Sequence, residues 1–260
     1  MTYFEIPKLS RMVSKVWLRN WDVFMKTFKV NFVPPFIEPL LYLFALGFGL
    51  GTFIEDIDGI SYARFIAPAL IAISIMNSSF FECTYGSYVR MYYQKTFDAI
   101  IATPLSIEEV IAGEILWGAT RSFINAVIML VVISFFGLIE FPSSLLIIPF
   151  SFLGGLLFAS IAMCFTATSP NINTLNYPSF LFISPMFLFS GTFFPLSVLP
   201  DPVRYFAIAA LPLTHVVSIV RSLTLAAPGE FILFSLLWIV VVSLVLFVLA
   251  VNLMKKRLIV

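Results

Sequence analysis

The chain has 260 residues, of which 60% are hydrophobic and 11% are charged, and its formal net charge is +1. Soluble proteins average about 25% charged residues, so this composition indicates a membrane protein and excludes a soluble globular domain. The small net charge also argues against a nucleic-acid partner, which would need a clustered basic face. No internal repeat or long linker is evident, so we expect one all-α membrane domain over residues 1–260.

The first 30 residues have the pattern of an amphipathic helix. Basic residues fall within an arc of about 80° on a helical wheel. They are Lys8, Arg11, Lys15, Arg19, Lys26 and Lys29. Trp17, Trp21 and Phe24 fall on the opposite side. This separation predicts a helix lying in the membrane interface over residues 1–30, with the tryptophans at the headgroup level. Packing of the helix on a protein partner is the alternative.

Six apolar stretches approach the length of about 20 residues that is needed to cross a bilayer. They cover residues 33–53, 65–88, 123–139, 145–167, 175–194 and 231–254. Six crossings put both termini on one side of the membrane. Of the 15 basic residues, six precede the first span, three lie between the second and third, and three follow the last. Because basic residues concentrate in cytosolic loops, we place both termini and residues 90–121 in the cytosol.

Residues 90–121 form the only long charged passage between the first and last spans. Within it, Ser106 and Glu109 have the spacing of a capping box, and Pro104 precedes them. This pattern predicts that a short helix begins near Ile107. We interpret the passage as a cytosolic hinge on which an external protein acts.

Prolines interrupt the passage between the fifth and sixth spans. Asp201 and Thr214 are suited to cap two helices of near ten residues, the second ending at Leu223. Helices of that length cannot cross a bilayer, so we predict two short external re-entrant helices between spans five and six. The residues that we assign to them are Pro195, Pro200, Arg204, Pro212, His215 and Arg221.

The sequence lacks the motifs of several enzyme classes. It has no phosphate-binding loop of the form G-x-x-x-x-G-K-[ST], so it does not bind ATP in that way. No cluster of ligands has the spacing of a metal site, and the single histidine, His215, indicates a polar contact rather than catalysis. We expect neither an enzyme nor a cofactor in this chain.

Two carboxylates lie in or beside the predicted spans, and intramembrane charges are often functional. Glu38 and Glu82 could carry protons in an ion-coupled secondary transporter, which is our alternative function. Exposure to interfacial water, or pairing with Arg90 or Arg121, is the structural alternative. A third hypothesis, a membrane scaffold that transports nothing, predicts no cavity that reaches solvent.

Aromatic and methionine side chains near the break at Gly191 would suit an amphipathic cargo, because they can repack around varied shapes. The residues that we predict to line a translocation path are Phe182, Met186, Phe187, Phe189 and Gly191. In the fourth span, Gly154 and Gly155 allow close approach of a second helix, and we interpret them as a packing face.

Three stretches, in this order, resemble the type-2 ABC exporter permeases of polysaccharides, lipo-oligosaccharides and drugs. They are NFVPPFIEPLLYLFALGFGLG at residues 31–51, FDAIIATPLSIEEVIAGE at residues 97–114, and SGTFFPLSVLPDPVRYFAIAALPLTHVVSIVR at residues 190–221. The resemblance covers nearly the whole chain. Within the family, the nodulation-factor export permeases look most similar.

The resemblance implies a permease in the bacterial inner membrane that works as two copies with two copies of a separate ATPase, which would bind ATP and Mg. It also implies that the hinge seats in the ATPase through Asp98, Thr103, Pro104, Glu108 and Glu109. The cargo would be an amphipathic, lipid-linked glycan or a drug-like molecule. A heterodimer of permeases, and a lateral lipid-facing route in place of a channel, stay open.

Overall fold

A computed structural model describes residues 5–28, 37, 40–57, 59–226 and 231–259. Over these residues the regular structure is helical, and the one β contact is an isolated bridge between Ile57 and Ile60. The predicted all-α class is therefore confirmed for the described part of the chain.

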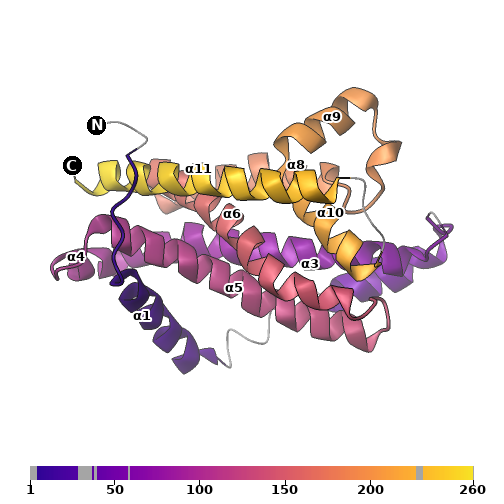
Figure 1. The fold of residues 1–260 in the computed structure, drawn as a ribbon, viewed down its shortest axis with the longest axis horizontal. Coiled ribbons are helices and arrows are strands. Elements are labelled where there is room, and N and C mark those ends of the chain that lie inside the picture. Colours follow the sequence, from indigo (N-terminus) through magenta and orange to yellow (C-terminus); the bar gives the residue numbers. More distant parts are fainter. Residues whose placement is uncertain (1–4, 29–36, 38–39, 58, 227–230, 260) are drawn as a thin grey trace.

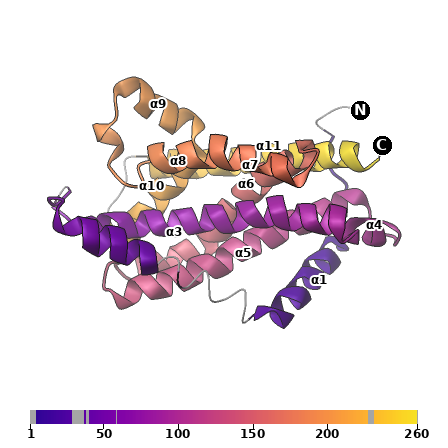
Figure 2. The same cartoon turned by 180° about the vertical axis from the view of Figure 1, so that it is seen from behind.

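Within the described residues, four helices are long and apolar enough to cross a membrane. They are Tyr62–Tyr93, which begins as α3 (Tyr62–Phe81), α5 (Ile107–Phe135), Ser143–Thr168, which contains α6 (Ile147–Thr168), and α11 (Ile232–Leu258). They run along the long axis of the molecule (Figures 1 and 2). The apolar window of Tyr62–Tyr93 is 72% buried, whereas that of α11 is only 17% buried. The Tyr62–Tyr93 helix therefore lies inside the bundle, and α11 presents a wide apolar face outward.

The two other predicted spans are represented by shorter helices. Residues 33–53 overlap the apolar helix Leu40–Thr52, and residues 175–194 overlap short helical segments that include α7 (Asn176–Pro178) and α8 (Ser184–Phe189). A bent pair, α9 (Asp201–Ala210) and α10 (Pro212–Thr224), meets at 88° and gives a fifth span if it is counted as one. The six-span count and the re-entrant character of this pair stay predictions.

The helix that begins at Ile107 is much longer than predicted. Its capping box is confirmed, because the Ser106 hydroxyl accepts from the Glu109 N–H at 3.2 Å and the Glu109 carboxylate accepts from the Ser106 N–H at 2.8 Å. The prediction of a short helix is wrong, since α5 continues for 29 residues and includes most of the predicted third span. No proline interrupts it, so nothing in the backbone stops the helix there.

The predicted caps of the external helices need correction. α9 has Pro200 at its N-cap and Asp201 as its first residue, and α10 begins at Pro212 with Leu211 at its N-cap. Thr214 therefore lies inside α10 and does not cap it. A proline fits the first turn of a helix because its φ angle is already set and its missing N–H is not needed there, which explains the earlier start.

α5 and α6 cross at very close range. A Cβ atom added to Gly155 would lie 2.9 Å from the Ala119 Cα atom and closer still to the Ser122 hydroxyl. The Ser122 hydroxyl donates across the crossing to the Ser151 carbonyl at 2.9 Å. This geometry supports the interpretation of Gly155 as a packing residue.

One end of the bundle gathers the charged passage. α4 (Thr96–Ile101) and the C-terminal end of α11 lie there, α1 (Val13–Lys26) packs against α5 nearby, and α9 projects at the opposite end (Figure 1). The helix predicted over residues 1–30 is confirmed in part: α1 covers Val13–Lys26, with Val13, Val16, Asn20 and Phe24 buried, whereas residues 5–10 are not helical. Its placement in a membrane interface stays a prediction.

Candidate functional site

A buried ionic network joins α1, α5 and the segment Glu82–Tyr93 that continues α3. The Glu114 carboxylate is fully buried and accepts hydrogen bonds from Arg90 Nε at 2.9 Å and Arg90 Nη2 at 2.6 Å. It also accepts from the Ser87 hydroxyl at 2.7 Å and from Asn20 Nδ2 at 2.8 Å. A buried carboxylate is stable only when it is paired in this way, so Glu114 fixes three segments relative to one another.

A second carboxylate, Glu82, extends the network. It accepts from Arg90 Nη1 at 2.8 Å and from the Trp117 indole at 3.0 Å, and its other oxygen lies 3.5 Å from Arg121 Nε. The structural alternative for Glu82, pairing with Arg90 or Arg121, is therefore confirmed. Glu38 lies outside the described residues.

The local backbone gives this network its shape. π-Helical turns at Glu82–Gly86 and Val89–Tyr93 widen the helix that continues α3, and such turns occur often at functional sites. A Cβ atom on Gly86 would lie 3.1 Å from Glu82 Oε1 and 3.4 Å from Arg90 Nη1. The absence of a side chain at Gly86 therefore leaves room for the ion pair.

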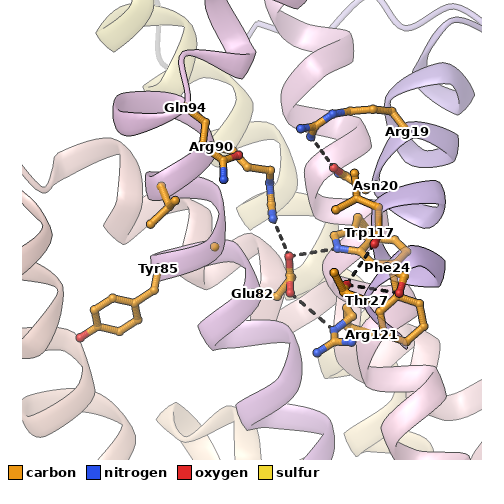
Figure 3. Close-up of a pocket in the computed structure, with 13 residues that line it drawn as sticks. Arg19, Asn20, Phe24, Thr27, Glu82, Tyr85, Arg90, Gln94, Trp117 and Arg121 are labelled. Atoms are coloured by element: carbon orange, nitrogen blue, oxygen red, sulfur yellow. Dashed lines mark hydrogen bonds and ion pairs between the residues drawn. The ribbon is translucent and has the colours of Figure 1, made fainter. Parts of the chain in front are cut away.

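A cavity of about 470 Å³ opens beside the network, between α1, α5 and the Glu82–Tyr93 segment (Figure 3). Three arginines and one carboxylate line it, together with amide, hydroxyl and aromatic groups. The lining residues are Arg19, Asn20, Val23, Phe24, Thr27, Glu82, Tyr85, Gly86, Val89, Arg90, Gln94, Trp117 and Arg121. Burial lowers the pKa of the Arg19 guanidinium, an effect that Glu114 opposes and Arg90 reinforces. The cavity is therefore a positively charged hollow with an aromatic wall.

The predicted hinge residues Asp98, Thr103 and Pro104 are exposed on α4 and the turn that follows it. Fully buried Phe97 anchors α4 to the bundle. Asp98 makes an exposed ion pair with Lys95 at 3.7 Å. These three predicted residues are thus accessible to a partner. They lie on α4 and the turn after it, and buried Phe97 fixes α4 to the bundle.

Glu108 and Glu109 instead bind groups within the chain. Glu108 accepts from the backbone N–H of Lys8 at 2.6 Å and from Lys255 Nζ at 2.6 Å. Glu109 accepts from the backbone N–H of Ser10 at 3.2 Å and also from the Ser10 hydroxyl. The two carboxylates therefore tie the N-terminal segment and the end of α11 to the first turn of α5.

The tryptophans of α1 pack against the protein. The Trp17 indole donates to the Thr120 hydroxyl on α5 at 2.8 Å and stacks on Trp21 at 5.6 Å between ring centroids. Trp21 in turn meets Trp117 edge-on at 6.4 Å. Arg19 donates to its neighbour Asn20 at 2.8 Å. This face of α1 is therefore an intramolecular interface with α5.

The predicted path residues divide between the core and the surface. Met186 is fully buried, and Phe187 packs on Phe193 at 4.8 Å. Phe182 packs on Phe165 at 5.6 Å, whereas Phe189 is 40% exposed. Gly191 has φ +73°, a conformation that glycine adopts without strain, at the break after α8. Their role in a translocation path stays a prediction.

At the opposite end, His215 makes the polar contact that was predicted, with its Nδ1 3.1 Å from the Ser235 hydroxyl and its ring stacked on Trp238 at 4.3 Å. Arg221 lies over the Phe65 ring at 4.1 Å and donates to the Gly191 carbonyl at 2.8 Å. The remaining residues assigned to this end are Pro195, Pro200, Arg204 and Pro212, which precede, begin or lie within the helical segments between residues 196 and 224. Both contacts help to fix α10.

Three members of the network were missed by reasoning from sequence: Asn20, Ser87 and Trp117. A signal existed for Asn20, because it follows buried Val16 by four residues and precedes buried Phe24 by four. Residues four apart share a helix face, so a polar residue within this stripe indicates a buried polar partner. The π-helical turns that bring Ser87 to Glu114 have no comparable signal.

The long apolar helices are those of a membrane protein, with an exposed charged turn at one end. A family model described as ABC-2 type transporter matches residues 13–225, so the chain belongs to the ABC-2 type transporter family.

Its relatives include nodulation protein J of Sinorhizobium fredii, which is 32% identical over 94% of this chain and 92% of its own. Nodulation protein J of Rhizobium meliloti is 35% identical over 82% and 81%, respectively. The inner membrane transport permease YadH of Escherichia coli is 25% identical over 72% and 73%. The resemblance to type-2 ABC permeases is therefore confirmed.

Proposed function

We propose that the chain is the permease subunit of an ATP-driven exporter that moves an amphipathic, lipid-linked glycan or drug-like cargo out of the cytoplasm or the inner leaflet. Family membership supports the role as a transport subunit and implies an ABC ATPase as the partner. The observation that carries the mechanism is the position of α4, which exposes Asp98 while Phe97 anchors it in the bundle.

The contacts around α4 suggest how force would spread from it. The first turn of α5 holds the N-terminal segment and α11 through Glu108, and six residues farther along α5 Glu114 holds α1 and Arg90. A push on α4 would therefore displace four segments together. ATP would shift the permease between states only if the ATPase binds one of them more tightly than the other.

In this proposal two copies of the permease and two of the ATPase assemble in the bacterial inner membrane, with both termini and α4 in the cytosol. The clustering of α4 with the end of α11 at one end of the bundle is consistent with that orientation (Figure 1). The wide exposed face of α11 would contact lipid or the second permease copy. ATP and Mg would be bound by the ATPase.

The rival function, an ion-coupled secondary transporter, receives less support. Glu82 would have to change its protonation during transport, yet two arginines and an indole hold its carboxylate in the structure. That arrangement suits a structural role for Glu82.

We expect Asp98→Ala to leave the fold intact and to weaken coupling to the ATPase. Its side chain is 60% exposed and only its pair with Lys95 would be lost. Loss of one interfacial charge contact commonly lowers affinity by about tenfold. The measurement is substrate-stimulated ATP hydrolysis by the complex that copurifies with the tagged chain from its native cells.

Asp201→Ala is the matched control, because Asp201 is also exposed in the first turn of a short helix but lies at the opposite end of the bundle. It should hydrolyse ATP as the unmodified complex does. Equal loss in both variants, or purified material that contains no phosphate-loop ATPase, would contradict the proposal.

A further inference from the structure

We propose that the arginine-lined cavity beside Glu82 binds a phosphate group, carried by an amphiphile of the cytosolic leaflet. The inference takes the cytosolic placement of this end from the proposed function. It concerns a site that family membership does not assign, and it applies whether the amphiphile is cargo or a resident lipid.

The cavity has more positive than negative charges around it. Arg19, Arg90 and Arg121 line it, against the carboxylate of Glu82 and that of Glu114 directly behind. Three positive charges thus face two negative ones. Desolvation makes an uncompensated buried charge costly, so a bound anion would stabilise this site.

Arg121 is the guanidinium best placed to receive that anion. Arg90 directs all three of its nitrogens to Glu82, Ser87 and Glu114. By contrast, Arg121 makes no hydrogen bond to any residue in the described ranges, and its Nε lies 3.5 Å from Glu82. Its guanidinium faces the same hollow as the Glu82 carboxylate (Figure 3). The Arg121 guanidinium is paired with Glu82 through Nε and lies over the Phe24 ring, and its two terminal nitrogens form a fork that matches the paired oxygens of a phosphate.

The walls explain why the phosphate should come from an amphiphile. The volume of about 470 Å³ lies within the range of about 300–1,000 Å³ that is typical of ligand sites, and it exceeds the needs of a bare anion. Val23 and Phe24 of α1, together with Trp117 of α5, give the cavity an apolar wall. Such a combination suits a headgroup whose chain continues along an apolar helix face.

The test uses the purified permease alone, in phosphatidylcholine vesicles, so it needs neither ATPase nor cargo. Dibrominated phosphatidic acid quenches the tryptophan fluorescence of residues that it approaches, and Trp117 lines the cavity. We expect dibrominated phosphatidic acid to bind about tenfold more tightly than dibrominated phosphatidylcholine. In Arg121→Gln this preference should fall to near unity, whereas Arg121→Lys should keep part of it.

Lys15→Gln is the matched control, because it removes one positive charge from an exposed position of α1 outside the cavity. It should keep the preference in full. If Arg121→Gln does not elute as folded protein, Arg19→Gln tests the same cavity from the other side. No preference in the unmodified protein, or equal losses in Arg121→Gln and Lys15→Gln, would overturn the site.

A third arm separates the two sources of phosphate. If millimolar inorganic phosphate displaces the brominated lipid, the anion site is supported, and its natural ligand is a soluble phosphate compound instead of a lipid. Unchanged lipid binding would support a membrane source. Because transport is never measured, failure of this test leaves the exporter proposal standing, and failure of ATPase copurification leaves the cavity to be judged by lipid binding alone.

Discussion

Replacing Glu114 by glutamine should destabilise the protein by about 3–5 kcal/mol, the usual effect of removing one partner of a buried ion pair. The fully buried carboxylate accepts from Arg90, Ser87 and Asn20. Glutamine has nearly the same size but turns an NH₂ group toward one of these donors. Arg90 would then keep only Glu82 as a counter-ion. Asn20 of α1 would lose its hydrogen bond to a charged acceptor on α5.

The measurement is the free energy of unfolding in detergent, with the fraction that elutes as folded protein after heating as a second readout. Glu140→Gln is the control, because Glu140 pairs with Arg64 through side chains that are 46% and 35% exposed. Solvent screens such a pair, and its loss should cost about 1 kcal/mol or less. A Glu114→Gln protein as stable as this control would show that the network contributes little to the fold.

Gly155→Ala should also destabilise the protein strongly, by about 3 kcal/mol, because the added methyl group would meet the backbone of α5 as well as a side chain. The Ala119 Cα atom, 2.9 Å from the new Cβ atom, cannot rotate away. α5 and α6 would have to separate, and overpacking of this kind commonly costs about 1–3 kcal/mol or more.

Gly154→Ala provides the comparison one residue earlier on the same helix. Its added methyl group would meet side chains alone: the Ile75 Cγ2 atom at 3.1 Å, which can move, and the two Val216 methyl groups at 3.9 Å, an ordinary contact distance. We expect a change within about 1 kcal/mol there, since alanine also favours the helix. Thermal unfolding of the two variants in the same detergent would measure the difference, and equal melting temperatures would contradict close contact between α5 and α6.

Local sequence signals predicted the local features well. The arc of basic residues located α1, and the pair Ser106 and Glu109 located the start of α5 to the residue. Both signals act within one or two helical turns, where side chains and backbone choose their partners without the rest of the fold.

Features that depend on tertiary packing were harder to predict. The charged passage at residues 90–121 was interpreted as a cytosolic hinge, but two of its charges, Glu114 and Arg121, lie on α5 and are paired with side chains of neighbouring segments. The tryptophans of α1 matched an interfacial belt, whereas in the structure Trp17 bonds Thr120 on α5. A side chain that can meet lipid can also meet a neighbouring helix, and the sequence alone does not distinguish the two.

The carboxylate of Glu108 holds the Lys8 backbone and the Lys255 side chain together, and Asn252 of α11 donates to the Glu5 carbonyl at 2.8 Å. The segment that contains Glu5 and Lys8 and the C-terminal end of α11 are therefore tied to each other and to the turn beside α4. Fluorophores attached to these two segments would report, by a change in energy transfer, each time these contacts break. Bulky fusions at these positions would strain the same contacts, so short tags are the safer choice for transport assays.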